Sequence, residues 1–399
     1  MSPLRLGVLS THPVQYQAPL YRALAARGDV DLTVFYAHRP TPEQQGNEFG
    51  VAFEWDTDLL GGYHSVFLNN RAATRGIGFG GFDTPEIGGH ISRGCFDAFV
   101  VNGWHARSYL QGIVGCWRSG TPVMVRGDSY LLPNERPLKR ALKGRLYPFF
   151  LRRLDACLSV GTLSEEYFRY YGARRIYRVP HFVDNEFFAT IGRTGRTREN
   201  LRAQWKIPRD AFVCSFVGKL IPRKRPLDLV RAAARNGVHL IFAGDGAIRA
   251  ECEREAHRLG VSATFLGFVN QSGLPDVHAC ADVFSLPSEI ETWGLVVNEA
   301  MASGLPVVVA DTVACGRDLV IEGETGFVHR VADVDSLARV LAATREASAS
   351  GRRMGESARS FIQRYNANSS ADALVQAVRL ARGATSVAPN EGRAAGATA

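Results

Sequence analysis

The sequence lacks the closely spaced cysteines and histidines that hold zinc or exchange disulfides. Its seven cysteines are scattered without a Cys-x-x-Cys pair, and its ten histidines include no His-Glu-x-x-His arrangement. Zinc hydrolase and thiol redox chemistry are therefore not indicated, and we expect no metal ion and no cofactor. An odd number of separated cysteines is typical of a reducing compartment, so a cytoplasmic location is expected.

Long apolar runs are also missing. No run approaches the ~20 residues that a helix needs to cross a bilayer. The start of the chain holds one short apolar strand, whereas a secretion signal needs a longer apolar core and a small-residue cleavage site. The sequence thus predicts neither a membrane span nor secretion.

The composition is that of an ordinary globular protein, because 46% of the 399 residues are hydrophobic and 22% are charged. A chain of this length usually divides into two domains. Strand-like runs alternate with helical patterns in both halves, which predicts an α/β fold of two Rossmann-like, doubly wound domains. The expected strands cover residues 4–9, 31–35, 96–101, 122–125, 156–160 and 176–179, then 212–217, 238–243, 263–266, 282–286 and 306–310.

The boundary between the two domains is expected near Phe188. Residues 1–188 form the first domain, 189–200 are a Gly-, Thr- and Arg-rich linker, and 201–365 form the second domain. Residues 366–382 have a helical pattern, and this helix can pack back on the first domain. Residues 383–399 contain too few large apolar side chains to order themselves.

Positive charge is concentrated in residues 136–154, within a chain whose net charge is +8. One hypothesis is that this segment contacts the inner face of an anionic membrane. The alternative is a solvated basic face whose leucines pack inward, and Pro148 predicts an interruption of the helix. Nucleic acid is not an expected partner, because a recognition helix and an aromatic stacking platform are both missing.

The segment 285–309 is the most informative part of the sequence. A strand ends near Pro287, a loop carries Glu291, and a helix that contains Glu299 opens near Gly294. Ligands of open α/β sheets bind beyond the carboxyl ends of the strands, where a helix start offers free N–H groups to a phosphate. The candidate amides belong to Trp293, Gly294 and Leu295. Taken alone, the two glutamates are equally typical of a helix start.

This segment resembles the signature of glycosyltransferase family 4, in which an E-x7-E pair precedes an Ala-Met-Ala-x-Gly-x-Pro-Val-Val-like run. Trp293 replaces the more common Phe. The matching residues are Glu291, Gly294, Leu295, Glu299, Ala300, Met301, Ala302, Gly304, Pro306 and Val307. The resemblance implies that Glu299 holds a ribose and that Glu291 holds hydroxyls of the transferred sugar.

A basic loop, 217–226, resembles the family's diphosphate-binding loop. It contains Gly218 and Lys224, while Lys219 replaces the usual Arg and Arg225 the usual Gly. The resemblance implies that the two lysines stabilise the departing diphosphate, whose charge grows as the glycosidic bond breaks. A solvated turn before a helix is the alternative. The turns with Gly244 and Phe268 resemble further family loops that approach the nucleotide.

Candidate residues of the first domain follow the ends of its strands. His12, Gln15 and Tyr16 lie in a loop where the family has a glycine, and they are candidates for substrate contact. His105 is the candidate catalytic histidine, since Asn102 falls where the family often has one. Arg126 and Asp128 are candidate acceptor contacts, or they pair with each other. The 179–184 turn, with His181 and Phe182 in place of Asn and Gly, supports only the fold.

The resemblance implies the GT-B architecture, with two Rossmann-like domains facing a cleft, and transfer with retention and without a metal. The expected donor is a UDP-sugar, with GDP next, and the acceptor is a sugar, a lipid-linked molecule or a small molecule. A nucleotide-sugar epimerase and a sugar phosphorylase of the same fold are the alternatives. Asp-x-Asp pairs at 29–31 and 56–58 leave a metal-dependent transferase as a weaker one.

Overall fold

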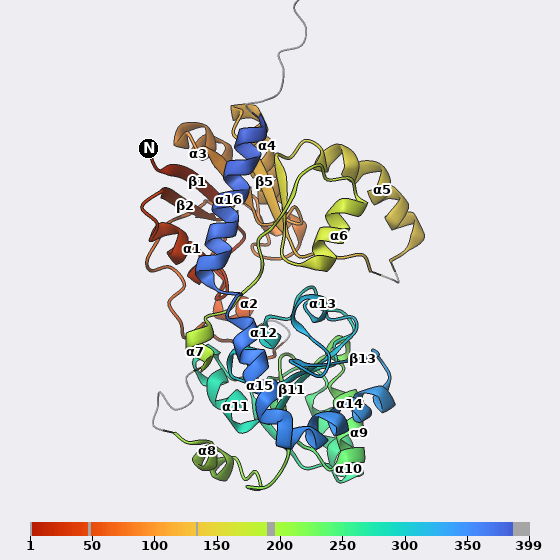
Figure 1. The fold of residues 1–399 in the computed structure, drawn as a ribbon. Helices are drawn as coiled ribbons and strands as arrows, with labels where there is room; N and C mark the ends of the chain where they lie inside the picture. Colours follow the sequence, from red (N-terminus) through yellow and green to blue (C-terminus); the bar gives the residue numbers. More distant parts are fainter. Residues whose placement is uncertain (1, 47–48, 133–134, 190–195, 386–399) are drawn as a thin grey trace, which may run out of the picture.

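The structure, a computed structural model, describes residues 2–46, 49–132, 135–189 and 196–385. It has two domains stacked one above the other, each with a parallel sheet between layers of helices (Figure 1). The expected architecture of two Rossmann-like domains is confirmed. The predicted linker lies partly outside the described residues, as does most of the predicted tail.

The N-terminal sheet has the order β3-β2-β1-β4-β5-β6-β7, and the C-terminal sheet has the order β10-β9-β8-β11-β12-β13. Both orders reverse direction beside the first strand, where doubly wound folds bind ligands. The strands are β1 Leu4–Ser10, β2 Val30–Tyr36, β3 His64–Phe67, β4 Ala98–Val101, β5 Val123–Gly127, β6 Ala156–Ser159, β7 Ile176–Arg178, β8 Val213–Val217, β9 His239–Ala243, β10 Ala263–Gly267, β11 Val283–Leu286, β12 Val307–Ala310 and β13 Gly326–His329.

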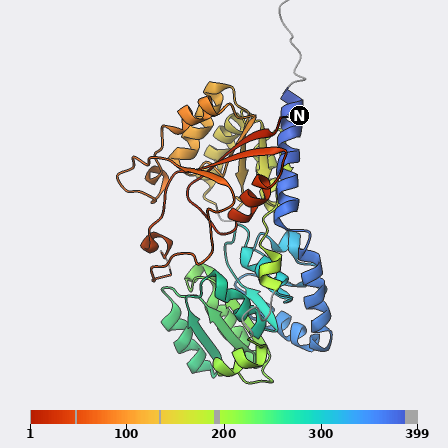
Figure 2. The ribbon, with the colours of Figure 1, turned by 90° about the vertical axis from the view of Figure 1, so that its left-hand side faces the viewer.

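Helices cover both faces of each sheet (Figures 1 and 2). They are α1 Ala18–Ala25, α2 Pro42–Gln45, α3 Ile87–Gly94, α4 Arg107–Ser119, α5 Pro137–Leu151, α6 Thr162–Tyr170, α7 Asn185–Ala189, α8 Arg198–Gln204, α9 Pro226–Asn236, α10 Arg249–Leu259, α11 Leu274–Cys280, α12 Leu295–Ala302, α13 Gly316–Leu319, α14 Val334–Glu346, α15 Ser348–Ile362 and α16 Ala367–Thr385. The central strands β8, β9, β11 and β12 are buried along their whole length, as expected of parallel strands covered on both sides.

The N-terminal domain has a hydrophobic core on each side of its sheet, and the chain passes from the first of these to the core of the C-terminal domain between Phe182 and Val183. Phe188 belongs to the core of the C-terminal domain, so the structure puts the crossing earlier than the expected boundary. Helix α16 returns to the first domain and lies against α1 (Figure 2). It contributes buried residues to the first core, namely Ala371, Leu374, Val375, Ala377, Val378 and Ala381.

Helix α5 runs through Pro148 without a break, so the predicted interruption is wrong. A proline at this position removes the N–H that would bond to the carbonyl of Gly144. Gly144 is exposed, and a Cβ added there would meet nothing within 4 Å. Water can therefore satisfy the carbonyl, which makes the proline tolerable.

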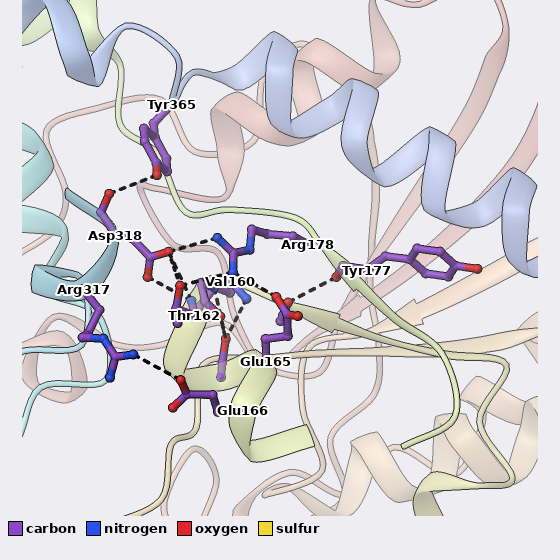
Figure 3. Close-up of polar contacts among 12 residues, drawn as sticks. Val160, Thr162, Glu165, Glu166, Tyr177, Arg178, Arg317, Asp318 and Tyr365 are labelled. Atoms are coloured by element: carbon purple, nitrogen blue, oxygen red, sulfur yellow. Dashed lines mark hydrogen bonds and ion pairs between the residues drawn. The ribbon is translucent and has the colours of Figure 1, made fainter. Parts of the chain in front are cut away.

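The two domains are tied together by a polar cluster around Asp318 of α13 (Figure 3). Its carboxylate accepts hydrogen bonds from the backbone N–H of Thr162 at 2.9 Å and the hydroxyl of Thr162 at 2.8 Å, and it pairs with Arg178 at 3.1 Å. Tyr365, in the segment that leads to α16, donates to the Asp318 carbonyl at 3.4 Å. With its side chain only 4% exposed, Asp318 fixes the N-terminus of α6 against the C-terminal domain.

Candidate active site

A cavity of about 530 Å³ lies between the two domains. This volume falls in the range of small-ligand sites. The C-terminal domain contributes the loop after β8 and the start of α12, and the N-terminal domain contributes the loop after β1 and the end of β5. The sequence-predicted residues that line it are Gln15, Tyr16, Asp128, Gly218, Lys219, Lys224, Glu291, Trp293, Gly294, Leu295 and Glu299.

Two predicted residues lie behind this lining. Gly244 has a φ of +148°, and a Cβ there would come within 2.0 Å of the Gly218 carbonyl oxygen. Gly244 therefore lets the loops after β8 and β9 pack closely. Phe268 packs against Phe53, with a centroid distance of 4.2 Å, and thereby joins the loop after β10 to the N-terminal domain.

The basic loop after β8 puts its cations at the cavity. Lys224 forms an ion pair with Glu291, and both side chains are mostly buried. The Lys219 ammonium lies 5.1 Å from the ring centroid of Phe49. An ammonium group has three donors, so Lys224 can hold Glu291 and still donate to a phosphate.

The backbone conformation of Arg225 accounts for the glycine that is usual at this position in the family that the loop resembles. Its φ of +53° is left-handed, a conformation that glycine adopts without cost. The side chain pairs with Asp228 at 2.6 Å and with Glu289 at 3.6 Å. These contacts offset the strain and hold the loop directly before α9.

Glu299 lies in α12 and is buried. Its Oε2 has no hydrogen-bond partner among the described residues. Burial raises the pKa of Glu299 from 4.5 to about 7, and a hydrogen bond with Gln271 only partly offsets this shift. The cavity therefore presents an unsatisfied carboxylate acceptor, which suits a ligand with hydroxyl donors.

Glu299→Gln is expected to stabilise the ligand-free protein at pH 8 but not below pH 4.5. A carboxyl whose folded pKa exceeds its unfolded value binds more protons when folded, so the wild type loses stability as pH rises from 4.5 to about 7. The loss is on the order of 3 kcal/mol. Urea unfolding of both proteins across this pH range measures it. A difference that does not change with pH contradicts the assignment.

A smaller cavity of about 280 Å³ adjoins the first on the N-terminal side. Tyr16, Asp128 and His181 line both cavities. His12, Asn102, His105 and Arg126 line only the smaller one. Burial lowers the pKa of His12 to about 4, with help from His38 and His105, so His12 is neutral at pH 7.

Asn102 and His105 both reach the smaller cavity, with different surroundings. The Asn102 amide donates to the Ser10 hydroxyl at 2.6 Å and contacts the Tyr21 hydroxyl at 3.1 Å. His105 is exposed, and its ring packs edge-on against Tyr109 at 5.3 Å. The histidine is therefore the side chain of the two that is open to a ligand.

Arg126 and Asp128 do not pair with each other among the described contacts, so that alternative is wrong. The Arg126 guanidinium donates to the carbonyl of Val179 at 3.2 Å and lies 3.3 Å from Nδ1 of His181. Asp128 instead accepts a hydrogen bond from the Thr292 hydroxyl at 2.9 Å, across the cleft. The two strand-end residues thus have separate roles.

His181 and Thr292 are site residues that sequence reasoning missed. His181 is buried between Tyr16 and Trp293, with ring centroids 5.3 Å and 5.8 Å away. Burial and the neighbouring Arg126 lower its pKa well below the usual value, so it is neutral. Their places in the sequence could have pointed to both residues, because His181 lies in the 179–184 turn and Thr292 follows the first glutamate of the E-x7-E pair.

Neither Asp-x-Asp pair forms a metal-ligand cluster, and no group of three or more His, Cys, Asp or Glu residues that could hold a metal occurs in the described residues. Asp29 pairs with Arg27 at 2.9 Å and with Arg379 at 2.7 Å. Asp58 reaches the main cavity, but its Oδ1 accepts from the N–H groups of Leu60 and Gly61. These aspartates are already engaged by protein groups.

Comparison with known proteins relates the C-terminal domain to a sugar-transferring family. Residues 197–361 match the family model described as "Glycosyl transferases group 1". A GDP-mannose-dependent alpha-mannosyltransferase of Mycolicibacterium smegmatis is 34% identical over 211 residues, which are 53% of this chain and 53% of that protein. A D-inositol 3-phosphate glycosyltransferase of the same organism is 36% identical over 180 residues, 42% of this chain and 41% of that protein. The chain spans about half the length of these curated relatives.

Solved structures resemble the whole chain in fold. The crystal structure of Anabaena HepE in complex with UDP matches with a TM-score of 0.72 at 18% identity. The match covers 95% of this chain and 100% of the HepE chain. Sucrose-phosphate synthase from Thermosynechococcus elongatus matches with a TM-score of 0.70 at 20% identity, covering 96% of this chain and 100% of its own. Both support the GT-B architecture. In the described part of the chain, no helix combines the length and apolar character needed to cross a membrane.

Proposed function

We propose that this chain is a glycosyltransferase that moves a sugar from a nucleoside-diphosphate donor to an acceptor hydroxyl. The observation that carries the proposal is the convergence of Glu299, Glu291 and Lys224 on one cavity at the start of α12. All three lie within the segment that matches the transferase family. The unsatisfied Glu299 acceptor, the basic loop and the helix start together suit a ligand with hydroxyls and phosphates.

In the proposed reaction, Glu299 accepts hydrogen bonds from the ribose and Glu291 holds hydroxyls of the sugar. Lys219, Lys224 and the first amides of α12 stabilise the diphosphate as the bond from the anomeric carbon to its oxygen breaks. The acceptor oxygen forms a bond to that carbon on the same face, so the configuration is retained. Its proton passes to the departing diphosphate.

The smaller cavity is the proposed place of the acceptor. It adjoins the donor cavity through Tyr16, Asp128 and His181, so an acceptor there can reach the sugar. Arg126 is held by the 179–181 turn and acts as a positively charged wall, while Asp128 and the neutral His12 and His105 can bond to hydroxyls. A sugar, a lipid-linked molecule or another small hydroxyl compound fits this chemistry.

The donor is tested by a panel of nucleotide sugars, with binding and slow hydrolysis as readouts. Relatives named for GDP-mannose and a similar fold solved with UDP make UDP- and GDP-hexoses the first members of the panel. Release of free nucleoside diphosphate with sugar transfer supports the proposal. Epimerised donor without transfer indicates an epimerase, and sugar phosphate formed from glycan and phosphate indicates a phosphorylase.

Transfer is expected to continue unchanged in EDTA. The reason is that the diphosphate is assigned to lysines and backbone amides, and these need no bridging ion. The rate with the best donor is measured with EDTA and with added magnesium or manganese. Loss of activity in EDTA that either metal restores contradicts the assignment and returns the Asp-x-Asp pairs to consideration.

A further inference from the structure

Helix α5 exposes an unusual amount of apolar surface. Leu138 is 83% exposed, Phe149 71%, Leu142 56% and Leu146 55%. At 100° of rotation per residue, Leu138, Leu142 and Phe149 lie within about 40° of one another and Leu146 borders them. We call these four residues the α5 stripe. The expectation that the leucines of residues 136–154 pack inward is wrong for Leu138, Leu142 and Leu146 and holds for Leu151 and Leu154.

The stripe is not a core face turned outward, because the opposite face of α5 is already packed. Leu151 is buried, and Tyr147 and Phe150 lie 5.7 Å and 5.8 Å from the ring of Trp104. Helix α5 lies at the outer edge of the N-terminal domain (Figure 1). A helix that is apolar on both sides needs a second apolar environment beyond its own domain.

Positive charge surrounds the stripe. Arg145 and Arg152 flank it on one side and Lys139 on the other, and all three are exposed. Residues 136–154 contain no Asp or Glu. The nearest preceding acid, Glu135, is 5% exposed beneath Lys139 and Lys143. We call these basic residues the basic rim, and any partner that covers the stripe meets this rim on both sides.

We propose that α5 docks the chain on the surface of an anionic lipid bilayer, with the α5 stripe in the acyl boundary and the basic rim at the headgroups. The helix has 15 residues, about 22 Å, so it lies in the interface instead of crossing it. A second copy is disfavoured, because pairing two stripes brings the basic rims together. Nucleic acid would complement the charge of the basic rim but would leave the four apolar side chains of the α5 stripe uncovered.

The docked helix follows the proposed acceptor site closely along the chain. The loop from Asp128, which lines both cavities, runs directly into α5. Within that loop Tyr130 donates to the carbonyl of Thr312 across the cleft at 3.4 Å. Docking brings this edge of the cleft to the membrane. The docking itself does not depend on the proposed reaction.

Vesicle flotation tests the proposal without a catalytic readout. The full chain is mixed with vesicles of phosphatidylcholine alone or with phosphatidylglycerol added, at low and at high salt. It is expected to float only with the anionic vesicles and less at high salt. Failure of the wild type to float at low salt overturns the proposal and leaves the proposed transferase activity untouched.

Two variants of α5 locate the contact. A stripe variant, Leu138→Ser/Leu142→Ser/Phe149→Ser, and a rim variant, Arg145→Glu/Arg152→Glu, are each expected to lower the partition coefficient at least about tenfold. The changed side chains are exposed, so unfolding transitions should match the wild type. Matched controls away from α5, Ile77→Ser/Phe79→Ser/Leu380→Ser and Arg209→Glu/Arg254→Glu, should float as the wild type does.

Three results overturn the assignment to α5. Binding that survives both α5 variants puts the membrane contact elsewhere. Equal loss in the control variants shows a general effect of charge or hydrophobicity. A dimer in light scattering that disappears in the stripe variant, with no flotation of the wild type, assigns the stripe to a second copy of the chain.

Discussion

Replacing Glu299 with alanine is expected to weaken binding of the donor's nucleoside diphosphate about tenfold to a hundredfold. The substitution removes the buried acceptor assigned to the ribose, and hydrogen bonds to a charged group are worth about 1.5–3 kcal/mol. Isothermal titration at pH 8, where the carboxylate is ionised, measures the affinity. The effect should be confined to binding, since the side chain is assigned to the ribose and not to the bond that breaks.

Two further variants serve as comparisons in this experiment. Glu299→Gln keeps one acceptor oxygen and should fall between the wild type and the alanine variant. Glu251→Ala changes an exposed glutamate of α10 and should bind as the wild type does. Full affinity of Glu299→Ala for every nucleotide that the wild type binds contradicts the role assigned to Glu299.

Replacing Lys224 with methionine is expected to lower turnover about a hundredfold to a thousandfold. The ammonium is assigned to the diphosphate, and its attraction grows as the leaving group gains charge. Nucleotide affinity should change much less than turnover. Single-turnover rates with saturating donor measure the effect, and Lys224→Arg, which keeps the charge, should restore part of the rate.

The ion pair between Lys224 and Glu291 provides a way to separate chemistry from structure. Removing Lys224 leaves a mostly buried carboxylate without its partner, which alone could distort the loop. Glu291→Gln removes that charge. If the pair were only structural, the double variant would regain the lost activity. If each side chain contacts the substrate, the double variant stays at least as slow as the slower single variant.

The sequence predicted the central strands because they are continuous apolar runs buried on both faces. It missed β3 and β13, which lie at the edges of their sheets. His64–Phe67 contains an exposed His and three half-buried residues, and Gly326–His329 begins with a glycine. An edge strand pairs with one neighbour and needs less apolar surface, so composition marks some edge strands, such as β7 and β10, and not others.

The same contrast applies to the site. Gly218, Lys224, Glu291 and Glu299 stand in compact segments whose spacing resembles a known family, so their presence at one cavity could be predicted. Contacts between the two domains could not be predicted from the sequence. Thr292 meets Asp128 from 164 positions away, and Lys219 meets Phe49 from across the cleft. Such pairs depend on how two independent sheets are oriented, which no local pattern encodes.

Helix α16 has a consequence for how the protein is made. Six of its side chains belong to the core that also contains β1, β2 and α1, so the N-terminal domain leaves the ribosome before the C-terminal domain but is completed after it. Until residues 367–385 emerge, the apolar surface of α1 and β7 stays uncovered, a state in which nascent domains aggregate. A fragment that ends near residue 188 should therefore be less soluble than one to which α16 is fused.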